Sequence, residues 1–87
     1  MPTTNMPEIL ARLQTTFDAI FLDPVTVTPE LCAADVKEWD SLLHISIVLS
    51  VESEFGIRFR VGEVESAQNV GQFAGLIEKH LREKNQQ

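Results

Sequence analysis

Three segments of the chain carry apolar residues at every third or fourth position, which is the spacing of one face of an α-helix. A chain of 87 residues buries only roughly 60–65% of the surface that it exposes when unfolded, so the three faces must share one thin core. The apolar positions are Ile9, Leu10, Leu13, Phe17, Ile20 and Phe21 in the first segment, Leu42, Ile45, Val48, Leu49 and Phe55 in the second, and Val70, Phe73, Ala74, Ile77 and Leu81 in the third. The sequence therefore predicts a small all-α bundle of three to four helices.

Capping residues set the predicted helix boundaries, because a short polar side chain accepts hydrogen bonds from the unpaired N–H groups of a first turn. Asn5 can cap the first helix, and Asp40 or Ser41 can cap the second. Asn69 can cap the last helix, with a glutamine three residues later in the capping-box position. Gly56 suits the left-handed residue that ends a helix, so the second helix is expected to end before it.

A long loop separates the first two predicted helices. Asp23 precedes a proline, which pushes it out of the helical region and ends the first helix before it. Within the connector that follows, residues 28–30 predict a single helical turn, and Leu31 and Val36 are expected to anchor the loop on the core. Ordered loops of such length in compact domains are usually functional.

The segment after the second helix, residues 57–61, alternates apolar and polar residues like a strand. No partner strand is evident, so we predict an extended connector with Ile57 and Phe59 turned inward. Residues 62–67 are expected to form a short helix, and residues 83–87 a loose tail.

The composition excludes several classes of protein. Thirteen acidic residues against seven basic ones give a net charge of −6, which argues against binding to nucleic acid. The single cysteine, Cys32, excludes an internal disulfide and a zinc site built on cysteines, and we predict no metal site. No apolar run approaches the ~18 residues of a membrane span, and the first residues do not resemble a signal peptide. We therefore expect one cytoplasmic domain over residues 1–87, ordered over about residues 6–83.

The acidic surplus lies in the first two thirds of the chain. Residues 1–57 contain nine acidic and two basic residues, whereas residues 58–87 contain four acidic and five basic ones. This distribution fits a surface that attracts a basic partner, and it equally fits a solvated acidic surface without a partner.

Ser41 stands at the exit of the long loop, in the first turn of the second predicted helix. Unpaired backbone N–H groups and the positive end of the helix dipole lie there, and both favour an anion. A phosphate on this hydroxyl would therefore be stabilised. Taken alone, however, an Asp-Ser pair before a helix usually serves only as a cap.

The tripeptide Asp40-Ser41-Leu42, opening a helix with a Glu-x-x-Phe end, resembles the 4′-phosphopantetheine attachment region of acyl carrier proteins. The resemblance covers nearly the whole chain, including the first amphipathic helix, the long loop and the Asn-capped last helix. It implies a bundle of the acyl-carrier type and a monomeric carrier that is not itself an enzyme.

The resemblance also implies a covalent cofactor. In this family a phosphopantetheinyl transferase moves phosphopantetheine from coenzyme A to the serine hydroxyl, and the thiol of the arm then carries acyl groups as thioesters between enzymes. By position, Ser41 is the expected attachment site, Asp40 caps the helix and helps to bind the transferase's metal-bound coenzyme A, and Leu42 contacts partners. The expected partners are this transferase and the acyl-loading and acyl-modifying enzymes of a dedicated pathway.

Four more residues are predicted to contact partner enzymes, two of them acidic and two apolar: Glu38, Glu63, Leu43 and Ile47. An exposed acidic surface suits fast, weak association with several enzymes. Ile47 falls outside the main apolar stripe of its helix, so it indicates either deep burial or an exposed docking patch.

Two residues near Ser41 have open roles. His44 follows Ser41 by three residues and shares its side of the helix, so it is expected either to contact the phosphate or to face solvent or a partner. Trp39 is either an anchor of the loop or a lid over the acyl chain.

The motif departs from that of fatty-acid carriers, which usually place acids directly after Asp-Ser-Leu and four residues after the leucine. Leu43 and Ser46 stand there, and Trp39 precedes the motif, so the chain resembles a specialised carrier. Fatty acyl, polyketide, and peptidyl or aminoacyl cargo all stay open, as does an unmodified helical adaptor. A hydrolase using Ser41 and His44 is disfavoured, because it also needs an oriented base and an oxyanion hole.

Overall fold

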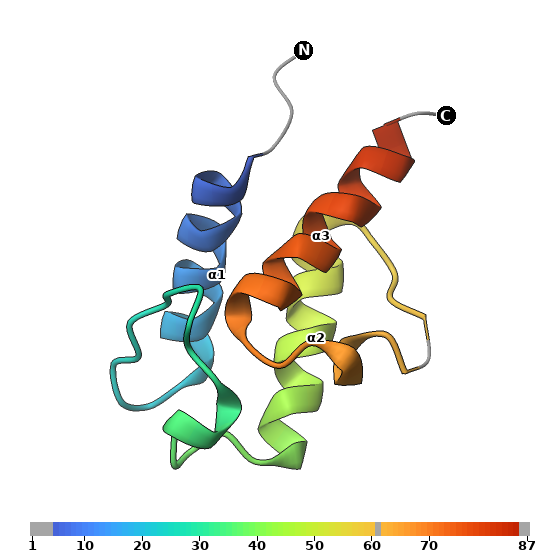
Figure 1. Ribbon diagram of the computed structural model, residues 1–87. Coiled ribbons are helices and arrows are strands. Elements are labelled where there is room, and N and C mark those ends of the chain that lie inside the picture. The colour runs from blue at the N-terminus through green and yellow to red at the C-terminus, as the bar shows by residue number, and fades with distance from the viewer. Residues whose placement is uncertain (1–4, 61, 86–87) are drawn as a thin grey trace.

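The computed structural model describes residues 5–60 and 62–85, the side chain of Asn85 excepted, and none of these residues lies in a strand (Figure 1). The helices are α1 (Met6–Ile20), α2 (Ser41–Phe55) and α3 (Val70–Asn85), with the short 3₁₀ helices η1 (Ala33–Asp35) and η2 (Val64–Ser66) in the connections. Helix α1 packs against both α2 and α3, and Figure 1 shows the long first loop passing around the lower end of α1 to reach α2. The predicted all-α bundle with a long loop between the first two helices is confirmed.

Helix α1 begins where its cap predicts and ends slightly early. The Glu8 N–H donates to the Asn5 side chain at 3.1 Å, which confirms the cap. The helix ends at Ile20 rather than directly before Asp23. The reason is a carboxylate brought in from the long loop: Glu38 accepts from the N–H of Leu22 at 2.9 Å and from that of Asp23 at 3.4 Å. These N–H groups therefore bond across the loop instead of along the helix.

The sequence-based choice of the buried face of α2 is wrong for three of its five apolar positions, whereas Phe55 is buried and Val48 is half-buried against the core. Leu42, Ile45 and Leu49 were expected to point inward, but 75%, 55% and 60% of their surfaces are exposed. They form an apolar strip along the outside of α2, which we call the outer strip.

The core side of α2 is formed by Phe55, as predicted, together with Ile47 and Val51, each at most 4% exposed. Half-buried Leu43 precedes them, so this face repeats every four residues. The predicted role of Ile47 in partner docking is therefore wrong, because its side chain lies inside the core. The hydrophobic pattern alone does not choose between the two sides, since α2 is apolar on both.

The long loop is fastened to α1 and α3 by hydrogen bonds to its backbone. The Gln14 side chain donates to the Val25 carbonyl at 2.7 Å and accepts from the Val27 N–H at 2.8 Å. At the other end of the loop, the Leu31 carbonyl accepts from the N–H of Val70 at 2.8 Å. The expected anchors of the loop, Leu31 and Val36, are half-buried against the core and confirm that prediction.

Pro29 makes a close backbone contact between this loop and α3. Its carbonyl accepts from the N–H of Gly71 at 2.8 Å, and a Cβ atom at position 71 would lie only 3.0 Å from that oxygen. Gly71 therefore permits the contact. The helical turn predicted at residues 28–30 is a hydrogen-bonded turn instead, and the short helix of this loop lies at Ala33–Asp35.

Beyond α2, Gly56 adopts φ 65° and ends the helix as predicted. The extended connector is confirmed over residues 57–60, with Ile57 buried and Phe59 half-buried, while Val61 lies outside the described residues. The predicted short helix at 62–67 is present as η2.

Glu63, at the start of this turn, is not the docking residue that was predicted. Its carboxylate accepts from the Arg60 N–H at 2.9 Å and pairs with His80 Nε2 of α3 at 2.8 Å. Only 14% of the side chain is exposed, so its oxygens stabilise the fold and are not presented to a partner. The hydrogen bond from the Arg60 backbone, followed by that from His80, lowers the pKa of Glu63 below its ordinary value of 4.5.

Helix α3 starts as predicted and ends later. The Asn69 side chain accepts from the Gln72 N–H, and the Gln72 side chain reaches back to the N–H of Gln68, both at 2.8 Å. The helix continues to Asn85, so the loose tail predicted from residue 83 is wrong for 83–85. Residues 1–4 and 86–87, also expected to be loose, lie outside the described residues. None of the described helices has the length and apolar character needed to cross a membrane.

A pair of substitutions tests which face of α2 is buried. Ile47→Ala removes a core side chain and should lower the free energy of unfolding by about 2–5 kcal/mol. Leu49→Ala, two residues along on the outer strip, should change it by no more than about 0.5 kcal/mol. Urea unfolding followed by circular dichroism measures both, and equal losses would contradict the assigned orientation.

The Glu63 contacts predict a pH-dependent contribution to stability. Because the folded-state pKa lies below 4.5, the ionised carboxylate stabilises the fold above that pH, and the contribution is lost as the pH falls toward the lowered pKa. Glu63→Gln should therefore be less stable than the native chain near neutrality, and the difference should shrink in acid. Urea midpoints measured between about pH 6 and pH 3 test this. Glu65→Gln, an exposed neighbour, is the control and should follow the native curve; parallel curves for Glu63→Gln would refute the assignment.

Candidate functional site

Ser41 is the first residue of α2 and is exposed at the exit of the long loop. Asp40 caps the helix: its side chain accepts from the Leu43 N–H at 2.8 Å, and its carbonyl accepts from the His44 N–H at 2.9 Å. Within the described part of the chain, the N–H groups of Ser41 and Leu42 have no acceptor. The site therefore combines a reachable hydroxyl with two free donors and the positive end of a helix dipole, an arrangement that stabilises a phosphate.

Trp39 holds the loop in place directly before this site. Its indole packs edge-on against Phe17 and Phe21 of the core, with ring centroids 5.3 and 5.7 Å apart. The interpretation of Trp39 as a loop anchor is supported by these contacts. The indole N–H donates to Nδ1 of His44 at 3.2 Å, and the two rings lie 27° from parallel.

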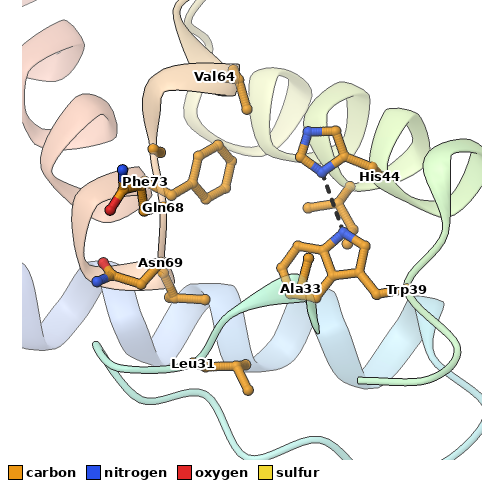
Figure 2. Close-up of a pocket in the computed structure, with 11 residues that line it drawn as sticks. Leu31, Ala33, Trp39, His44, Val64, Gln68, Asn69 and Phe73 are labelled. Atoms are coloured by element: carbon orange, nitrogen blue, oxygen red, sulfur yellow. Dashed lines mark hydrogen bonds between the residues drawn. The ribbon is translucent and has the colours of Figure 1, made fainter. Parts of the chain in front are cut away.

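A small cavity opens beside this aromatic pair (Figure 2). Its volume is about 70 Å³, and it lies between α2, the end of the long loop, η2 and the start of α3. Figure 2 shows Trp39 and His44 on one side of the cavity, Val64 and Phe73 across from them, and Leu31 below. Most of the lining is apolar, so the cavity suits the end of an aliphatic or aromatic group.

A larger, open groove of about 490 Å³ runs along the outer strip of α2. Ile45 and Leu49 of α2 line it together with Phe59 of the following connector. His44 and Val64 line both the groove and the cavity. These two side chains therefore form the boundary between the outside groove and the inside space.

The structure brings some of the predicted site residues close together. Asp40, Ser41, Leu42 and His44 all lie in the first turn of α2 or directly before it, and Leu42 is the most exposed of the outer strip. The half-buried docking candidates Glu38 and Leu43 are also near in sequence. The Glu38 carboxylate accepts a hydrogen bond from the backbone of the long loop, and Leu43 packs against the core.

Sequence reasoning missed two parts of this surface. It assigned Ile45 and Leu49 to the core, although they are exposed beside the groove. It also did not predict the hydrogen bond between Trp39 and His44. Their spacing is compatible with a contact, since Trp39 directly precedes the helix cap and His44 lies one turn into the helix. The hydrogen bond itself depends on how the loop packs on the core.

Comparison with known proteins gives two relatives. No family model matches the sequence. An acyl carrier protein from Thermosynechococcus vestitus is 31% identical over 67 residues, which cover 76% of this chain and 83% of that protein. The solution NMR structure of the holo acyl carrier protein from Geobacter metallireducens is similar with a TM-score of 0.75 and 34% sequence identity, over 99% of this chain and 93% of that chain. The likeness thus extends to both sequence and fold.

Proposed function

The chain belongs to the acyl carrier protein family, and on that premise we propose that Ser41 bears a 4′-phosphopantetheine arm whose thiol carries acyl groups as thioesters. The chain is accordingly a carrier and not an enzyme. The observation that carries the proposal is the exposed Ser41 hydroxyl at the first position of α2, next to the free N–H groups of the helix end. The cofactor would be derived from coenzyme A, and the enzyme that attaches it would be a phosphopantetheinyl transferase.

The attachment step is a phosphoryl transfer. The Ser41 oxygen forms a bond to the phosphorus next to pantetheine while the pyrophosphate bond of coenzyme A breaks. The hydroxyl proton passes to a base of the transferase, and adenosine 3′,5′-bisphosphate leaves. The chain itself supplies the exposed nucleophile, and the end of α2 stabilises the new phosphodiester anion. Asp40 holds the turn that presents Ser41 through its cap to the Leu43 N–H.

The outer strip is the surface we propose for docking of partner enzymes. Leu42, Ile45 and Leu49 expose apolar side chains in line with Ser41, and the first turn of α2 contains no acidic residue. Exposed apolar side chains grouped in this way are typical of interaction sites. The net charge of −6 would still attract basic surfaces from a distance, whereas the apolar contact would select among them. This combination favours the dedicated enzymes of a specialised acyl pathway.

Intact-mass spectrometry after incubation with coenzyme A and a broad-specificity phosphopantetheinyl transferase tests the attachment site. The native chain should gain one phosphopantetheine group, and Ser41→Ala should gain none. Ser46→Ala, which changes another exposed serine of α2, is the matched control and should be modified like the native chain. No adduct on the native chain would instead favour an unmodified helical adaptor, and an adduct on Ser41→Ala would place the arm elsewhere.

The docking surface is tested by the kinetics of the same reaction. Leu42→Ala should lower kcat/KM for the transferase about fivefold or more, as expected when an interface anchor is truncated, without changing the thermal unfolding midpoint. Leu22→Ala removes an equally apolar, exposed side chain from the long loop and should leave kcat/KM unchanged. Equal rates for Leu42→Ala and the native chain would refute the assigned docking role.

A further inference from the structure

The imidazole of His44 is held in one defined state by Trp39. An indole nitrogen is a donor only, so in the 3.2 Å contact between the two rings Nδ1 of His44 must accept. A neutral imidazole that accepts at one nitrogen carries its proton on the other. The Nε2–H group of His44 is therefore a hydrogen-bond donor whose direction is set by an indole that is itself packed against the core.

This donor is directed toward Val64. Figure 2 shows the edge of the imidazole away from Trp39 turned toward Val64, and both residues line the cavity. His44 is half-buried, and within the described residues Nε2 has no acceptor. This nitrogen is still reached by solvent, so an acyl oxygen at the same place would replace water as its acceptor.

The dimensions of the cavity place a bound chain past this donor. A volume of about 70 Å³ is small next to the roughly 150 Å³ that holds benzene, so only the end of a short chain enters. A chain that enters from the open groove passes His44 and Val64, which line both spaces. An oxygen atom on the part of that chain beside His44 meets the Nε2–H group, whereas a methylene group at the same place leaves it unpaired.

From these contacts we infer that His44 is a specificity-determining residue that donates a hydrogen bond to an oxygen of the carried acyl chain. The chain then holds short hydroxyacyl or oxoacyl groups in preference to saturated groups of equal length. The inference rests on the proposed function, because it names the cargo of the arm on Ser41. Trp39 is a positioning residue here, since it acts on the cargo only through His44.

The test compares two cargoes that differ by one hydroxyl. The native chain is loaded by a phosphopantetheinyl transferase from butyryl-coenzyme A or from 3-hydroxybutyryl-coenzyme A, and the cleavage of each thioester by hydroxylamine is timed. Each rate is divided by that of the corresponding free acyl-coenzyme A, which removes intrinsic reactivity. The 3-hydroxybutyryl group should be protected about two- to tenfold more than the butyryl group, the range expected for one net hydrogen bond.

Substitutions assign this protection to the imidazole. His44→Phe keeps a ring but removes the donor, and it should abolish the difference between the two cargoes. His44→Gln places an amide N–H near the position of Nε2 and should restore part of it. Trp39→Phe keeps an aromatic ring in the core but leaves Nδ1 without its donor. It should shift the ¹⁵N resonance of Nδ1 and reduce the selectivity, while the thermal midpoint is followed separately.

Each contrary outcome has a distinct meaning. Adduct formation on Ser41 with equal protection of both cargoes, or selectivity that persists in His44→Phe, overturns this inference and leaves the carrier function intact. A ¹⁵N spectrum of the unmodified chain with the His44 proton on Nδ1 also overturns it. So does a change of the phosphodiester ³¹P shift in His44→Phe that is equal for both cargoes, since His44 would then serve the phosphate. No adduct on Ser41 refutes the proposed function itself, and the inference with it.

Discussion

The burial of Ile47, Val51 and Phe55 against the core fixes the rotation of α2, and the rest of the surface follows from that rotation. Burying an apolar side chain of this size contributes roughly 1.5–3 kcal/mol, so the three together contribute several kcal/mol to a fold of the usual stability of about 5–15 kcal/mol. Turning the helix over would bury the outer strip in their place, so the fit of these three side chains to the surrounding core sets the orientation. In that orientation Leu42 and Leu49 lie on the opposite side of the helix and face solvent.

The same rotation connects the core to the site. Trp39 is packed on Phe17 and Phe21, and it ends the loop directly before the residue that caps α2. His44 lies one turn into the helix, on the side where the cavity opens, and accepts from the indole. Ser41, the imidazole of His44 and the outer strip are therefore positioned by one helix and one aromatic cluster.

Features that depend on local chemistry could be predicted from the sequence. The caps at Asn5, Asp40 and Asn69 each require one short polar side chain, and all three are observed. The acyl carrier protein family could also be predicted from the sequence, because the Asp-Ser-Leu motif stands at the start of a predicted helix. The first turn of α2 and the exposure of Ser41 followed from the same residues.

Features that depend on packing between distant segments could not be predicted. Part of the buried side of α2 was misassigned because its hydrophobic pattern has two apolar sides, and only packing against α1 and the rest of the core chooses between them. Glu63 and His80 are 17 residues apart, and their pairing joins the connector before η2 to α3, so a predicted docking acid is a structural one. The close approach of Pro29 to Gly71 likewise exists only once the loop has docked on α3.

The central claim is that the start of α2 carries a phosphodiester while its buried face holds the bundle together. A two-dimensional ³¹P–¹H correlation spectrum of the chain after treatment with transferase and coenzyme A tests it most directly. The account predicts a single phosphodiester resonance correlated with the Ser41 β-protons, with the amide resonances of buried Val51 and Ile77 unchanged. A correlation to any other serine, or loss of the buried amide resonances on modification, would contradict it.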